Sequence, residues 1–278
     1  MIATDLNTQY NARKLVLNHA EYSQRWDILA AQYREDAKGE LDIPYGPSER
    51  SRYDFFPCGE PDAPVCIYIH GGYWRSRDRK TYSHIAKGLN ARGISLAVPS
   101  YDLVPNVTIA HIIDQMRACV RSVWSKTSKR PVVAGNSAGG HLTGAMLATD
   151  WSKIDNVPED VVTSAMALSG LFDLTPLVDL DINDDLRLSA EEARAVSPVF
   201  WPAPRQGLKF IAAVGAEESQ PFKDQSRNLS DTWNKAGIGT DYLEAPDCNH
   251  FSIVDDAATE GALLFEKLVS MIKAETGK

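Results

Sequence analysis

The chain lacks the features that would point to several common classes of protein. None of its apolar runs approaches the length of a membrane span, and its first residues, MIATDLNTQYNARK, hold no apolar stretch of the secretory type. The net charge is -8, and no cluster of lysine and arginine rises above this acidic background, which argues against nucleic acid or an anionic membrane as the main partner. We therefore expect a cytoplasmic protein.

Cysteine is scarce. The 278 residues include four cysteines, at positions 58, 66, 119 and 248, and no two of them form a C-x-x-C pair. Cys66 and Cys119 lie in apolar runs, which favours buried free thiols over disulfides. The chain also has no H-x-x-x-H motif and no clustered Asp and His, so the sequence predicts no bound metal.

The composition and the order of the apolar runs are typical of one large domain. At 44% hydrophobic and 24% charged residues, the composition is that of a globular protein with a sizeable core. From about residue 64, strand-like runs alternate with helix-like runs, which predicts a mostly parallel sheet with helices on both faces. The expected strands are 51–56, 65–69, 94–98, 131–134, 162–168, 208–214 and 240–245, and the expected helices are 80–90, 108–125, 141–148, 222–236 and 256–273.

Two segments depart from this alternation within a single domain, residues 1–278. Residues 1–45 are expected to form an N-terminal arm, extended to about residue 17 and then helical from Asn18 until just before Lys38. Residues 174–206, with acidic turns and three prolines, read as an inserted, cap-like segment. Four side chains should share the buried face of the arm helix: Tyr22, Trp26, Leu29 and Tyr33.

The motif Gly135-x-Ser137-x-Gly139 lies between a strand-like and a helix-like run. A serine is a weak nucleophile unless a sharp turn presents it and a neighbour takes its proton. Glycines two residues before and after Ser137 would relieve the crowding at such a strand–helix turn. The motif is common by chance, so a plain glycine-rich turn is the alternative interpretation.

The base and the acid should follow at other strand ends, because in open parallel sheets the site lies at the carboxyl edge. Of six histidines, His250 follows the last strand, whereas His141 reads as a packing residue. After strand 208–214, Glu218 is the favoured acid and Glu217 the next candidate. The less favoured carboxylates are Asp173, which reads as a helix N-cap, Asp224 and Asp247.

The loop His70-Gly71-Gly72-Tyr73-Trp74 follows another strand. We expect Gly71, Gly72 and Ala138 to supply the backbone N–H groups of an oxyanion hole, with His70 anchoring the loop. Trp74 reads as a residue of the core or of a pocket wall.

The chain as a whole resembles the kynurenine formamidase (arylformamidase) group of α/β-hydrolases. The motifs that carry the resemblance are Tyr45-Gly46, His70 to Trp74, Tyr101-Asp102-Leu103-Val104-Pro105, Gly135 to His141, Ser169 to Leu174 and Asn249-His250-Phe251-Ser252. By position, the resemblance implies the α/β-hydrolase fold, Ser137 as nucleophile and His250 as base. Relatives often have aspartate followed by serine where this chain has Glu218-Ser219, so Glu218 is the implied acid and Glu217 remains an alternative.

The implied reaction is hydrolysis of N-formyl arylamines, with N-formyl-L-kynurenine the leading substrate and no cofactor required. Tyr73 and Trp74 are expected to contact substrate, and Arg75 and Arg77 are candidates for binding a substrate carboxylate. Two rival functions are a carboxylesterase of short acyl esters and a binding protein that keeps the fold without catalysis. A homodimer is a further hypothesis.

Overall fold

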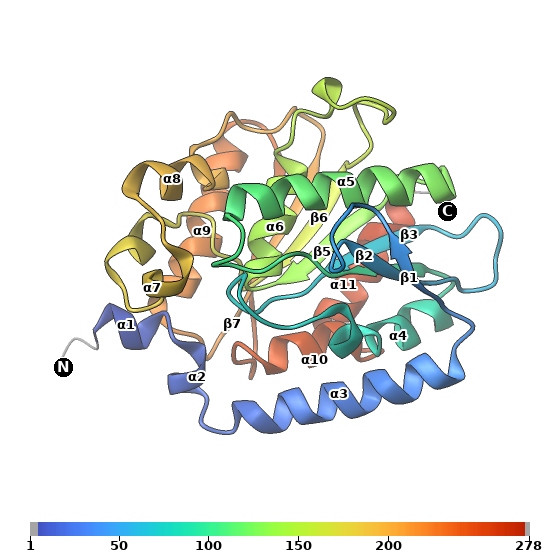
Figure 1. Cartoon of the computed structure of the whole chain (residues 1–278), viewed down its shortest axis with the longest axis horizontal. Helices are drawn as coiled ribbons and strands as arrows, with labels where there is room; N and C mark the ends of the chain where they lie inside the picture. The colour runs from blue at the N-terminus through green and yellow to red at the C-terminus, as the bar shows by residue number, and fades with distance from the viewer. Residues whose placement is uncertain (1–4, 276–278) are drawn as a thin grey trace.

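Residues 5–275, which a computed structural model describes, form one eight-stranded sheet between two layers of helices (Figure 1). The strand order is β1-β2-β4-β3-β5-β6-β7-β8; the pairs β1–β2 and β2–β4 are antiparallel, and all later pairs are parallel. The strands are β1 (Glu40–Pro44), β2 (Arg52–Phe56), β3 (Val65–Ile69), β4 (Ser95–Pro99), β5 (Val132–Asn136), β6 (Ser164–Leu168), β7 (Lys209–Gly215) and β8 (Gly239–Ala245).

Eleven α-helices and four 3-10 turns lie within the described residues. The α-helices are α1 (Leu6–Gln9), α2 (Ala12–Leu15), α3 (His19–Asp36), α4 (Ile85–Ala91), α5 (Ile109–Thr127), α6 (Ala138–Leu147), α7 (Asn183–Leu186), α8 (Ala190–Ala195), α9 (Gln220–Lys235), α10 (Ser252–Ala258) and α11 (Leu263–Glu275). The 3-10 turns are η1 (Arg79–Tyr82), η2 (Trp151–Lys153), η3 (Thr175–Asp179) and η4 (Pro198–Phe200).

The central strands are buried on both faces, because successive side chains of a strand point to opposite sides. In β3, Ile67 and Ile69 join the core beneath α5, α6 and α9, whereas Cys66 and Tyr68 join the core beneath α3, α4, α10 and α11. This burial explains why these strands read as continuous apolar runs. The predicted sheet with helices on both faces is therefore confirmed.

Strand β1 was not predicted, since its residues were assigned to the N-terminal arm. Its side chains are exposed or half-buried, and it lies at the edge of the sheet, antiparallel to β2. An edge strand buries neither face fully, so it carries no apolar signal, and Pro44 at its end fits an edge position.

Two predicted helices are each divided in two. The segment 80–90 forms the turn η1 followed by α4, and the last helix is split into α10 and α11. Gly261 lies between α10 and α11 with φ +83°, and the Leu264 N–H donates to Asp256 Oδ1 at 2.7 Å at the start of α11. The break therefore comes from a local turn with its own cap, which the helical periodicity on either side concealed.

The arm is more helical than expected. The prediction of an extended segment is wrong for the described residues 5–17, where α1 and α2 form, while residues 1–4 lie outside the described part. Asp5 and Asn11 start these short helices by accepting hydrogen bonds from Thr8 N and Lys14 N, at 3.0 and 3.3 Å. Helix α3 begins after Asn18 as predicted.

The buried face of α3 differs by one residue from the prediction. Trp26 is buried as expected, with Tyr22 and Tyr33 packed against the same core, but Leu29 is 42% exposed. Ala30 is fully buried in its place, because a small side chain lets the helix lie close to the domain.

The segment 174–206 contains η3, α7, α8 and η4 and lies next to α1 (Figure 1). Helix α8 starts with a capping box in which Ser189 and Glu192 bond reciprocally. The segment is hydrogen-bonded to α6 through His141, whose Nε2 lies 2.7 Å from the Val196 carbonyl oxygen. His141 is thus a packing residue, as predicted.

Cys66 and Cys119 are buried free thiols, as expected. Within residues 5–275, no helix combines the length and the apolar character needed to cross a bilayer.

Three histidines lie inside the protein as neutral imidazoles, with His70 and His141 fully buried and His84 half-buried. Burial lowers the pKa of His70, His84 and His141 to about 4 each. In the described structure one ring nitrogen of each has no hydrogen-bond partner: Nε2 of His70, Nε2 of His84 and Nδ1 of His141. Protonation would place a charged N–H with no acceptor inside the protein.

These histidines predict a loss of stability in mild acid. Because their native pKa is below the unfolded value of about 6.5, the unfolded chain binds more protons between pH 6.5 and 4, and stability falls as the pH falls. Each histidine should contribute a slope of about 1.4 kcal/mol per pH unit in this window. The free energy of unfolding can be measured with urea at several pH values. Its slope against pH should be smaller by about that amount in His141→Gln, whereas it should not change in His111→Gln, at a half-exposed position. Equal slopes for both variants would contradict this assignment.

Candidate active site

Ser137 occupies a sharp turn between β5 and α6. Its φ and ψ are +55° and −118°, which few residues other than glycine adopt. The turn is held by the Ser137 N–H, which donates to the Leu168 carbonyl at 2.8 Å, and by the His141 N–H, which donates to the Ser137 carbonyl at 3.0 Å. The structure therefore presents Ser137 as the motif predicted.

The glycines of the motif are required by close backbone contacts. A Cβ on Gly139 would lie 2.0 Å from the Ile69 carbonyl oxygen, and one on Gly135 would lie 2.5 Å from the same atom. The end of β3 and the start of α6 can approach each other only without side chains here. The interpretation as a plain glycine-rich turn does not account for this crowding around one strained serine.

His250 and Glu218 are in direct contact. His250 Nδ1 lies 2.6 Å from Glu218 Oε2, although the two residues come from the loops after β8 and β7. Glu218 Oε1 also accepts hydrogen bonds from the Gly215 N–H at 2.8 Å and from the Ser169 hydroxyl. The carboxylate is almost fully buried, so these donors replace its hydration and fix its orientation.

The other carboxylates considered for this position lie elsewhere. Glu217 is exposed, and its backbone N–H donates to the Cys248 carbonyl at 3.0 Å. Asp173 accepts from the Thr175 N–H at 2.9 Å, but the N-cap of η3 is Leu174, so Asp173 stabilises the turn before η3 and is not the helix N-cap that was predicted. Asp224 accepts a hydrogen bond from a side-chain amide of its own helix, α9, and Asp247 is exposed.

The loop after β3 is anchored as predicted for His70. His70 Nδ1 lies 2.7 Å from the Gly71 carbonyl oxygen, and the ring stacks on Tyr101 with centroids 4.3 Å apart. Tyr101 in turn donates from its hydroxyl to the His70 carbonyl at 2.8 Å. The loop thus has a rigid base in the core.

The two glycines of this loop have different roles. The Gly71 N–H donates to Asn136 Oδ1 at 3.2 Å, so it is already used within the protein. Gly71 instead lets the loop lie against the serine, since a Cβ there would be 3.1 Å from the Cβ of Ser137. Gly72 lines the pocket in front of Ser137 and has φ +116°, which favours glycine.

Of the two predicted substrate contacts, only Tyr73 has a side chain at the pocket, and its contact with substrate stays a prediction. Trp74 is fully buried in the core and meets the ring of His141 edge-on at 5.0 Å, so it does not reach the pocket. Its positive φ of +54° turns the side chain inward, behind the loop.

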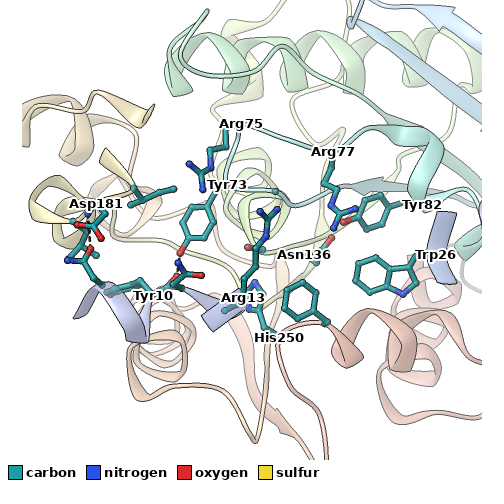
Figure 2. Close-up of a pocket in the computed structure, with 18 residues that line it drawn as sticks. Tyr10, Arg13, Trp26, Tyr73, Arg75, Arg77, Tyr82, Asn136, Asp181 and His250 are labelled. Carbon is teal, nitrogen blue, oxygen red and sulfur yellow. Dashed lines mark hydrogen bonds between the residues drawn. The ribbon is translucent and has the colours of Figure 1, made fainter. Parts of the chain in front are cut away.

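Ser137 and His250 line the same pocket, which has a volume of about 220 Å³ (Figure 2). The wall includes the aromatic rings of Trp26, Tyr82 and Phe251 as well as that of Tyr73. Phe222 lies behind His250, with ring centroids 4.6 Å apart, and restricts the motion of the imidazole. Ser137 and His250, which follow different strands, therefore face one pocket at the carboxyl edge of the sheet.

The arm supplies part of this pocket. Tyr10 is held by Gln225 Nε2, which donates to its hydroxyl at 3.2 Å, and by the Tyr73 hydroxyl, which donates to its carbonyl. The Ser219 hydroxyl donates to the neighbouring Gln9 carbonyl at 2.7 Å. The arm is therefore fastened both to the loop that carries Glu218 and to the loop after β3.

Sequence reasoning missed four residues of the site: Tyr10, Arg13, Asn136 and Ser169. Asn136 and Ser169 directly follow or end buried strands at the carboxyl edge of the sheet, which is a signal that could have identified them. Tyr10 and Arg13 lie in a polar segment without periodicity, where no such signal exists.

Within residues 5–275, no group of three or more His, Cys, Asp or Glu side chains is arranged to hold a metal ion.

Comparison with known proteins agrees with this geometry. A family model described as the alpha/beta hydrolase fold matches residues 66–253. A kynurenine formamidase from Danio rerio is 29% identical over 240 residues, covering 84% of this chain and 81% of that protein. A carboxylesterase from Mycobacterium tuberculosis is 26% identical over 232 residues, covering 73% and 72%. The crystal structure of a proposed thioesterase from a Silicibacter species has a TM-score of 0.86 at 29% identity, covering 98% of this chain and 100% of that one.

These matches confirm the resemblance predicted from the motifs.

The crowding at the turn predicts a large cost for adding one methyl group. Gly139→Ala should destabilise the protein by about 3 kcal/mol or more, because the Cβ would overlap the Ile69 carbonyl. Gly239→Ala is the matched control, since its Cβ would lie at an ordinary 3.4 Å from the Leu208 carbonyl. Urea unfolding of both variants measures the difference, and similar midpoints would contradict the crowding argument.

Proposed function

Because the chain belongs to the alpha/beta hydrolase fold family, we propose that it is a serine hydrolase that cleaves N-formyl arylamines, with N-formyl-L-kynurenine the leading substrate. The observation that carries the proposal is the arrangement of three side chains from three loops. Ser137 and His250 line one pocket, and His250 is hydrogen-bonded to the buried Glu218. The likeness to kynurenine formamidase over most of the chain supports the choice of substrate.

In the first step, Ser137 Oγ attacks the formyl carbon while His250 Nε2 takes the hydroxyl proton. Glu218 accepts the hydrogen bond of the Nδ1–H, which fixes the tautomer that leaves Nε2 free as a base. Its negative charge also stabilises the imidazolium that forms.

The carbonyl oxygen becomes negatively charged in this step and needs donors already in place. We assign this role to the backbone N–H groups of Gly72 and Ala138, the latter at the start of α6. Gly71 is left out because its N–H is donated to Asn136. Each such donor contributes on the order of a hundredfold to a thousandfold in rate.

In the second step, the C–N bond breaks as the His250 imidazolium protonates the leaving nitrogen, which releases the arylamine and leaves a formyl ester on Ser137. Water then attacks this ester with His250 again as base, and formate departs. No step requires a metal or an organic cofactor.

The pocket suits a compact aromatic leaving group. A formyl group is small, so most of the 220 Å³ is left for the arylamine, and the wall offers several aromatic rings for stacking.

A carboxylesterase of short acyl esters is the second candidate, and the carboxylesterase relative favours it. Both reactions use the same catalytic groups, so only the relative kcat/KM on formamides and esters separates them. A binding protein without catalysis is a weaker candidate because the serine, imidazole and carboxylate are all present. The cytoplasmic location and the homodimer stay predictions from the sequence.

The nucleophile has a direct test. Purified protein should hydrolyse N-formyl-L-kynurenine, and Ser137→Ala should lower kcat/KM about ten-thousandfold or more, because the formyl group then has no acceptor. A panel with p-nitrophenyl acetate distinguishes the esterase, and labelling of Ser137 by a fluorophosphonate tests the non-catalytic alternative. Equal turnover by wild type and variant would rule out the serine mechanism.

The two neighbouring glutamates provide a matched pair. Glu218→Gln should lower kcat about a thousandfold to ten-thousandfold, because a neutral amide can neither fix the tautomer nor stabilise the imidazolium. Glu217→Gln removes the same charge from an exposed position and should change kcat less than about threefold. Steady-state kinetics with the preferred substrate decides, and the opposite ranking would move the acid to Glu217.

A further inference from the structure

The pocket carries a positive charge in a protein that is acidic overall. Its wall includes Arg13, Arg75 and Arg77, and Asp181 is the one carboxylate among the described residues that line it. The net charge of the whole chain is -8. A concave site of opposite sign to the rest of the protein attracts anions in preference to cations.

The three arginines differ in how far their charge is already neutralised. Arg75 forms an ion pair with Asp185 at the rim. Arg77 donates to the hydroxyl of Ser23 in α3, a neutral acceptor. For Arg13, whose side chain is exposed, the described part of the chain shows no ion pair with a carboxylate, and its pKa is lowered by partial desolvation and then by the charges of Arg77 and Arg75. The charges of Arg13 and Arg77 are therefore left for a ligand.

The position of Arg13 is fixed by the arm. It lies on α2, three residues after Tyr10, which is bonded to the loop after β3 and to α9. In Figure 2 its side chain extends from α2 into the middle of the pocket, between Tyr73 and Asn136. A guanidinium offers a planar fork of donors that matches a carboxylate.

We propose that Arg13 and Arg77 form a carboxylate subsite of the pocket, so that the preferred substrates are arylformamides that carry a carboxylate on the leaving group. This inference rests on the proposed function and specifies its substrate class. The formyl group lies at Ser137, and the carboxylate binds where the arm meets the loop after β3. The arm then determines substrate specificity, in addition to supplying part of the pocket wall.

The test compares two substrates that differ only in the carboxylate: N-formyl-L-kynurenine and N-formylkynuramine. In Arg13→Gln, kcat/KM for the carboxylate substrate should fall about tenfold to a hundredfold, and kcat/KM for N-formylkynuramine should change less than about threefold. Lys14→Gln is the control, because it removes the same charge from the next residue of α2, which does not line the pocket. A similar loss on both substrates, or none on either, would overturn the subsite.

A binding measurement separates this inference from the proposed reaction. Calorimetric titration of Ser137→Ala with L-kynurenine and with kynuramine needs no turnover. L-kynurenine should bind at least about tenfold more tightly, and the added change Arg13→Gln should remove that preference. If the preference is found but wild type does not hydrolyse N-formyl-L-kynurenine, the reaction is wrong and the subsite stands. If wild type hydrolyses it but the two ligands bind equally, the subsite is wrong and the reaction stands.

Discussion

The buried carboxylate of Glu218 joins the ends of three strands. One of its oxygens accepts from the loop after β6, through Ser169, and from the end of β7, through Gly215, and the other bonds to His250 after β8. A carboxylate almost out of contact with water is stable only when all its donors are in place. The geometry around His250 is thus set by the same contacts that close this edge of the sheet, so the site and the fold stabilise each other.

The parts of the site that were predictable are those fixed by the position of strand ends. Ser137 and His250 follow β5 and β8, and because parallel strands bring their carboxyl ends to one edge of the sheet, both residues could be expected at that edge. The choice between Glu217 and Glu218 was open because adjacent residues share the same strand end. Only the course of the turn after β7, which points one side chain inward and the other to solvent, separates them.

Backbone donors and loop side chains were harder to predict. That the Gly71 N–H is donated to Asn136 depends on the side chain of a residue 65 positions later. Trp74 was expected to contact substrate together with Tyr73, but a left-handed backbone at both residues sends the two rings in different directions. The edge strand β1 and the short helices of the arm have no apolar periodicity, since they bury few side chains.

The attachment of the arm has a consequence for how the protein acquires its shape during synthesis. Gln9 and Tyr10 are bound by Ser219 and Gln225, which are added to the growing chain 210 and 215 residues later. The contact of this segment with Tyr73 can form early, but its contacts with Ser219 and Gln225 cannot form until β7 and α9 have been made. Closure of the pocket is a late event in the maturation of the nascent chain, even though it uses one of its earliest parts.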